Sequence, residues 1–177
     1  MSNQSPFAIL AGLAERSRQI ATELPAIENT QRLWNGLGFT LLGHQFVAPM
    51  SEVGELMRVP QATRLPGVKP FVLGIANVRG RLMAILDLAT FFGSKTSNLR
   101  SLRRVLTVED EEQYFGFVID ESLGMQHFPQ EAFEEGIEVD SMFQPFVKGG
   151  FRVGSSVWPI LSLTALAADP DLEKLAR

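Results

Sequence analysis

Short apolar segments, each bounded by glycine or proline, follow one another from Trp34 to Leu161. Their length suits strands better than packed helices, and the Gly and Pro residues between them are typical of turns. This succession predicts a mainly β fold of small barrels or a sandwich. Each half of the region contains a hairpin, an irregular connection and a strand that ends in an acidic residue, at Asp87 and Asp120. The internal echo favours two small barrels.

The expected strands pair locally. Segments 37–42 and 45–50 flank a hairpin turn at Gly43-His44. Two more apolar strands meet at Gly80, and the second, 82–88, is apolar at nearly every position, which predicts burial on both faces. The remaining strands are expected at 53–59, 104–108, 114–120, 124–128, 151–153 and 157–161, with an irregular stretch at 129–142.

Helices are expected at both ends of the chain. Ser5 can cap a helix that runs to Leu24, with an apolar stripe that either packs on the barrels or docks a partner. Ser162 is expected to start a closing helix. The predicted organisation is a helical extension and linker at 1–33, a β body of two barrel subdomains at 34–168 and a helical tail at 169–177.

Composition excludes several classes of function. The 177 residues include no cysteine and two histidines, which excludes disulfides, thiolate nucleophiles and Cys-rich zinc sites. A net charge of -4 opposes a dedicated nucleic-acid binder. No signal peptide or membrane-spanning run is evident, so we expect a cytoplasmic protein that is not inserted in a membrane. We expect no metal and no cofactor.

Two other functions are weighed from the residues. A small hydrolase could use Asp87 or Asp120 with His127, but His127 lies in no recognisable catalytic context, and we rank this reading last. A β-barrel nucleic-acid module is the main alternative. Its basic patch would consist of Arg79, Arg81, Arg100, Arg103 and Arg104. Without interleaved aromatic residues, these arginines fit a solvated or ion-paired face better.

Polar residues interrupt the apolar strands at Asn77-Val78-Arg79-Gly80. An arginine in such a position pairs with a nearby acid or is aimed at a partner's carboxylate. Glu55 is the acid that we expect beside Arg79. The pattern leaves open whether the pair is structural or binds a partner.

At these residues the sequence resembles the CheW family of chemotaxis coupling proteins, from about Trp34 to Ala167. The clearest block runs from Gly74 through Asn77 and Arg79-Gly80 to Asp87-Leu88, and it matches the family signature at fixed offsets. Ala84 departs from it, since the family usually has proline there. Within the family, the sequence is most similar to the PilI-like branch of type IV pilus chemosensory systems, which controls twitching motility.

The resemblance implies a CheW-like fold of two interlocked five-stranded SH3-like β-barrels. It also implies a non-catalytic adaptor that links methyl-accepting chemoreceptors to a CheA-like histidine kinase at membrane-associated arrays. One face would dock the kinase's CheW-like regulatory domain, and the groove between the barrels would take the receptor's helical tip. The partner-binding residues implied by motif position are Val53, Glu55, Asn77, Arg79, Gly80, Arg104, Gly116, Asp120 and Met125. Of these, Gly80 and Gly116 are expected to set backbone geometry, and Arg104 stands where the family often has an apolar residue.

Overall fold

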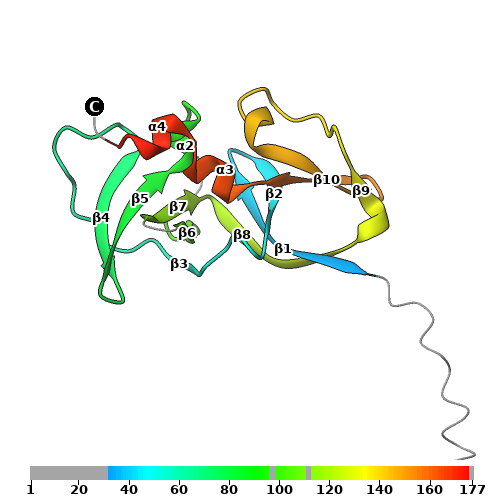
Figure 1. Cartoon of the computed structure of the whole chain (residues 1–177), viewed down its shortest axis with the longest axis horizontal. Helices are drawn as coiled ribbons and strands as arrows, with labels where there is room; N and C mark the ends of the chain where they lie inside the picture. The colour runs from blue at the N-terminus through cyan, green and yellow to red at the C-terminus, as the bar shows by residue number, and fades with distance from the viewer. Residues whose placement is uncertain (1–31, 96–98, 111–112, 176–177) are drawn as a thin grey trace, which may run out of the picture. The chain divides into compact units, whose positions relative to one another are not determined.

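The computed structural model describes residues 32–95, 99–110 and 113–175. These residues form two sheets that curl beside each other, with short helices between and after them (Figure 1). The mainly β prediction is therefore confirmed. The helix expected at Ser5–Leu24 lies outside the described residues.

The first sheet combines strands from both ends of the described chain. Its order is β8 (Glu121–Pro129), β1 (Leu33–Leu41), β2 (His44–Pro49), β11 (Ser156–Leu161), β10 (Val147–Val153) and β9 (Phe133–Glu134). The second sheet is contiguous in sequence. Its order is β3 (Leu56–Arg58), β6 (Arg104–Asp110), β7 (Gln113–Ile119), β5 (Arg81–Asp87) and β4 (Val72–Val78).

The two sheets repeat one pattern of strands. In each, two antiparallel hairpins are joined by their second strands in parallel: β2 beside β11 in the first sheet, and β5 beside β7 in the second. A further short strand, β9 or β3, flanks the first strand of one hairpin. The echo seen in the sequence is thus a structural repeat of five strands.

The first sheet nevertheless has six strands rather than the five expected. The extra strand is β8, which pairs with β1 from Leu33↔Pro129 to Thr40↔Glu121. It begins before Gly124 because a register shift near Gly38 accommodates that glycine within the strand. The stretch expected to be irregular holds the 3-10 turn Gln130–Ala132 and β9, and a second such turn, Gln144–Phe146, precedes β10.

A shared hydrophobic core joins the two sheets. Phe39 and Phe46 from the first sheet and Leu86, Leu106 and Phe117 from the second belong to one buried cluster. On β5, Met83 and Ile85 face a smaller cluster on the other side of the second sheet. This alternation confirms the predicted burial on both faces from Met83 onward, whereas Leu82, which is 70% exposed, lies outside the core. A third cluster, around Phe128 and Phe151, belongs to the first sheet.

The short helices begin at capping side chains. Asp87 caps α2 (Leu88–Phe91), and Ser162 caps α3 (Leu163–Ala167), as expected for the closing helix. Asp169 caps α4 (Pro170–Glu173), whose Leu172 is fully buried in the shared core. The tail predicted at 169–177 therefore packs into the body as far as the structure describes it.

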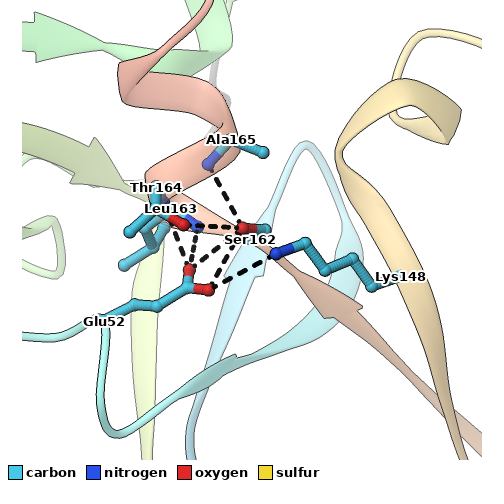
Figure 2. A network of polar contacts seen from close by, with 6 residues as sticks. All are labelled: Glu52, Lys148, Ser162, Leu163, Thr164 and Ala165. Carbon is cyan, nitrogen blue, oxygen red and sulfur yellow. Dashed lines mark hydrogen bonds and ion pairs between the residues drawn. The ribbon is translucent and has the colours of Figure 1, made fainter.

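Glu52 attaches the segment between β2 and β3, which crosses from the first sheet to the second, to the start of α3. Its carboxylate accepts hydrogen bonds from the Leu163 backbone N–H at 2.6 Å, from Thr164 N–H at 3.2 Å and from the Ser162 hydroxyl at 3.1 Å (Figure 2). Lys148 Nζ lies 3.9 Å from the same carboxylate. One side chain thus connects the β2–β3 crossing to the N-terminus of α3. No pattern in the sequence pointed to it.

Asp120 occupies the second crossing, because it alone separates β7 from β8. Its backbone N–H donates to the Thr40 carbonyl at 3.0 Å, and its Oδ2 accepts from the Leu42 N–H at 2.7 Å. Leu42 has a φ of 53°, so the β1–β2 turn is Leu42–Gly43 and not the Gly43-His44 turn that we expected. The distant carboxylate supports a conformation that leucine rarely adopts.

Candidate functional site

The turn between β4 and β5 presents Arg79 on the protein surface. Arg79 and Gly80 have φ values of 53° and 81°, the pair of positive angles that a two-residue type I′ hairpin requires. Asn77 Oδ1 accepts a hydrogen bond from the Gly80 N–H at 2.9 Å. The Asn-x-Arg-Gly spacing therefore builds a locally braced turn with an arginine at its tip.

Glu55 lies opposite this tip, at the start of β3. Arg79 Nη2 donates to Glu55 Oε1 at 2.7 Å, so the pairing predicted from the sequence is present. Glu55 is held in turn by its backbone, whose carbonyl accepts from Thr107 N–H at 2.8 Å. The neighbouring Val53 is half-buried against the shared core. The Arg79 side chain is 78% exposed, which leaves most of the guanidinium facing solvent.

A second exposed ion pair lies at the same end of the sheet. Arg81 Nη1 donates to Glu109 Oε1 at 2.6 Å, and the Arg81 guanidinium lies 4.7 Å from the Tyr114 ring centroid. Exposed pairs of this kind contribute about 0–1 kcal/mol each to folding. Their arrangement is thus better suited to a polar contact surface than to holding the fold.

The two outer strands β3 and β8 are among the elements that carry exposed apolar side chains. Leu56 of β3 is 38% exposed, and Leu123 and Met125 of β8 are 38% and 52% exposed. Each strand ends the order of its sheet, so each also presents an unpaired strand edge. Apolar side chains beside a strand edge are typical of a surface that receives a partner.

The histidines and acids of the hydrolase hypothesis have other contacts. His127 Nδ1 lies 2.6 Å from Asn35 Oδ1, whereas Asp87 caps α2 and Asp120 binds the Leu42 N–H. Among residues 32–95, 99–110 and 113–175, no group of three or more His, Asp or Glu side chains could hold a metal ion. The structure therefore brings together no catalytic set of the kind considered from the sequence.

Comparison with known families shows where this surface belongs. The model of the CheW-like domain matches residues 35–171. The chain belongs to the CheW family. That match spans both sheets, the Asn77–Gly80 turn and Glu55.

Individual proteins of the same family are similar to this chain. The chain is 46% identical to protein PilI of Pseudomonas aeruginosa over 93% of its length and 92% of the relative's. It is 29% identical to the chemotaxis protein CheW of Helicobacter pylori, over 68% of this chain and 69% of that one. The scaffolding protein TtCheW of Thermoanaerobacter tengcongensis has the same fold, with a TM-score of 0.71, 22% identity and coverage of 82% of this chain and 100% of that chain.

The other site residues implied by the CheW resemblance lie in different settings. Gly116 is in β7, where a Cβ atom would meet Val105 Cγ1 at 2.7 Å, so close packing requires glycine there. Asp120 is 4% exposed and holds the β1–β2 turn from inside. Both positions are buried, so neither presents a side chain to solvent.

Arg104 and Met125 also lie away from the Glu55–Arg79 pair. Arg104 begins β6 and donates to the backbone carbonyls of Ser101 and Arg103, each at 2.9 Å. Met125 faces solvent on β8. Ala84, where the CheW family usually has proline, pairs with both β4 and β7, and β5 continues through it without interruption.

The basic patch considered from the sequence is divided between two ends of the second sheet. Arg79 and Arg81 are in ion pairs at the β4–β5 turn, as a paired face predicts. Arg100, Arg103 and Arg104 lie at the opposite end, where β6 begins. Among the described residues, no helix is long and apolar enough to cross a membrane.

Proposed function

We propose that this chain is a non-catalytic coupling protein that links a CheA-like histidine kinase to methyl-accepting chemoreceptors in a type IV pilus system. It would act in the cytoplasm, at membrane-associated receptor arrays. Membership of the CheW family and 46% identity to PilI over most of both chains support this proposal. Two surfaces with different chemistry on one rigid β body provide for two partners.

The observation that carries the proposal is the exposed Glu55–Arg79 pair. A pair of this exposure contributes little to stability, yet the chain accepts a positive φ at Arg79 to present it. Asn77 and Gly80 fix the turn, so the guanidinium meets a partner with little loss of backbone freedom. Arginine also offers donors for bidentate recognition of a carboxylate. We therefore assign this surface to the kinase.

The receptor is assigned to the apolar side chains of the outer strands. Leu56 on β3, and Leu123 and Met125 on β8, are exposed apolar side chains of the kind against which an amphipathic helix packs. This assignment separates the two partners by chemistry: a polar contact for the kinase and an apolar one for the helical receptor tip.

The test is binding of the purified full chain to the regulatory domain of the CheA-like kinase from the same source, measured by calorimetry. Arg79→Ala and Glu55→Ala are each expected to weaken binding by roughly tenfold or more, as for a central polar contact. Arg152→Ala is the matched control, since Arg152 also forms an exposed pair, with Glu134 on the other sheet. It should bind like the wild type.

A charge exchange tests whether the partner needs an ion pair as such or the positive charge at 79 and the negative charge at 55. The double variant Glu55→Arg with Arg79→Glu restores an ion pair but reverses its direction, so a partner that reads these charges should still bind poorly. Wild-type affinity in all these variants would reject the assignment of this surface. For the receptor, Met125→Ser should weaken co-sedimentation with receptor signalling fragments and leave kinase binding unchanged.

A further inference from the structure

An arginine-lined cleft opens at the end of the second sheet opposite the Glu55–Arg79 pair. Three adjoining cavities of about 380, 270 and 250 Å³ make up this cleft, and all three share Val59 and Arg100 in their walls. The guanidinium groups come from β3, the connection 59–71, the loop before β6 and β6 itself. They belong to Arg58, Arg64, Arg100, Arg103 and Arg104.

The cleft concentrates positive charge without balancing it. No acidic side chain is among the described residues that line the three cavities. Within residues 32–95, 99–110 and 113–175, none of the five arginines forms an ion pair, although the whole chain carries a net charge of -4. Like charges brought together at one place repel each other unless an anion joins them.

Arg103 gives the cleft an unused donor. Its Nε is buried and has no hydrogen-bond partner, one of two such side-chain atoms among the described residues. Buried donors are nearly always satisfied in folded proteins, so this Nε has the capacity for one more acceptor. Arg104 supports the arrangement, because its Nη1 donates to the carbonyls of Ser101 and Arg103 and thereby braces the loop that carries Arg100 and Arg103.

The floor of the cleft selects among anions. Val59, Leu73, Ile85 and Val118 line it, and no aromatic residue is found among the described residues of its walls. Single-stranded nucleic acid binds by stacking bases on aromatic rings, which this floor lacks. Aliphatic side chains below a ring of guanidinium groups instead fit a peptide that alternates carboxylates with an aliphatic residue.

We propose that this cleft binds an extended acidic peptide segment of a partner protein, through bidentate contacts between its carboxylates and these arginines. The site is independent of the proposed kinase contact, since Arg58 and Arg104 lie at the opposite end of the strands from Glu55 and Glu109. Arg104 is a positioning residue here, and Arg64, Arg100 and Arg103 contact the peptide.

Fluorescence anisotropy of the full chain tests the proposal. The probe is a short labelled peptide in which Asp and Glu flank two leucines, and the matched peptide carries Asn and Gln in place of the acids. The wild type should bind the acidic probe, with affinity that falls as salt rises, and should not bind the amide peptide. Arg100→Gln with Arg103→Gln should weaken binding by roughly tenfold or more.

Two variants keep the result interpretable. Arg64→Gln with Arg100→Gln changes only exposed side chains and should also lose most of the binding if the Arg100–Arg103 variant proves unstable. Arg152→Gln is the control for lost charge outside the cleft. Equal binding by the cleft variants, equal binding of the amide peptide, or tighter arginine-dependent binding of a single-stranded oligonucleotide would each overturn the proposal. Kinase binding by the cleft variants should be unchanged, so this test and that of the coupling function fail separately.

Discussion

The two sheets contain the same tight turn at equivalent places in the repeat and support it in different ways. Leu42–Gly43 has φ values of 53° and 82°, and Arg79–Gly80 has 53° and 81°. In the first sheet, the turn is held by the buried Asp120, 78 residues away, and Leu42 packs against the shared core. In the second, it is held by the adjacent Asn77 and presents a solvent-exposed arginine. One turn serves the fold, whereas the other, braced locally, leaves its side chain available for binding.

The largest expected loss follows from removing the support of the first turn. Asp120→Ala leaves the part-buried Leu42 N–H without its acceptor and removes a buried carboxylate that holds the turn, so it should lower the free energy of unfolding by about 2–3 kcal/mol. Urea denaturation measures this loss. Asp120→Asn keeps an acceptor oxygen and should lose clearly less. If Asp120→Ala unfolds at the wild-type midpoint, the first turn does not depend on the distant carboxylate.

The next largest loss of stability is expected in the connection between β2 and β3, which Glu52 attaches to α3. Glu52→Ala removes the acceptor shared by Ser162, Leu163 and Thr164, and should cost about 2 kcal/mol. Glu52→Gln, with one carboxamide oxygen, should fall between this variant and the wild type. Thermal unfolding followed by circular dichroism provides the measurement. Equal melting temperatures for the wild type and Glu52→Ala would show that the connection in Figure 2 contributes nothing to stability.

A matched pair of glycine variants compares the two turns directly. At Gly43 and Gly80 an added Cβ would meet nothing within 4 Å, so Gly43→Ala and Gly80→Ala differ from the wild type mainly in backbone strain. Each should lose about 1 kcal/mol of stability, because alanine disfavours positive φ. Only Gly80→Ala should also weaken kinase binding. Weakened binding in both variants would contradict the division of roles between the turns.

The smallest expected effect on stability is at Arg79 itself. Arg79→Ala removes an exposed ion pair and should change the free energy of unfolding by less than about 0.5 kcal/mol. Its loss of kinase binding should therefore occur in a fully folded protein, which denaturation and calorimetry on the same sample can establish. A large loss of stability would make the pair structural, the other role that the sequence left open.

Structural features could be predicted from the sequence where the residue types themselves indicated burial or pairing. Burial of β5 on both faces from Met83 onward follows from its continuous apolar residues. The pairing of Glu55 with Arg79 was also predicted, although β3 and β4 are not neighbours in the sheet as that prediction assumed. The predicted position of the first turn was wrong because leucine is rarely found in tight turns, so the pattern gave no reason to include Leu42. Asp120, distant in sequence, supports its conformation.

The arginine cleft could not be read from the sequence for a related reason. Arg58, Arg64 and Arg100 are far apart along the chain and meet only because β3, β4 and β6 belong to one sheet. Grouping arginines by sequence proximity instead joined Arg79 and Arg81 to Arg100, although strand register puts these residues at opposite ends. The roles of Glu52 and β8 likewise depend on contacts between remote segments.

The combination of strands from both ends in the first sheet has a consequence for biosynthesis. β1 and β2 leave the ribosome first, but their neighbours β8 and β11 are not available until Glu121 and then Ser156 have been translated. The second sheet, from β3 to β7, is contiguous and can assemble in the interval. During translation, the nascent β1–β2 hairpin thus waits with both of its strand edges unpaired, which exposes the chain to aggregation in this interval.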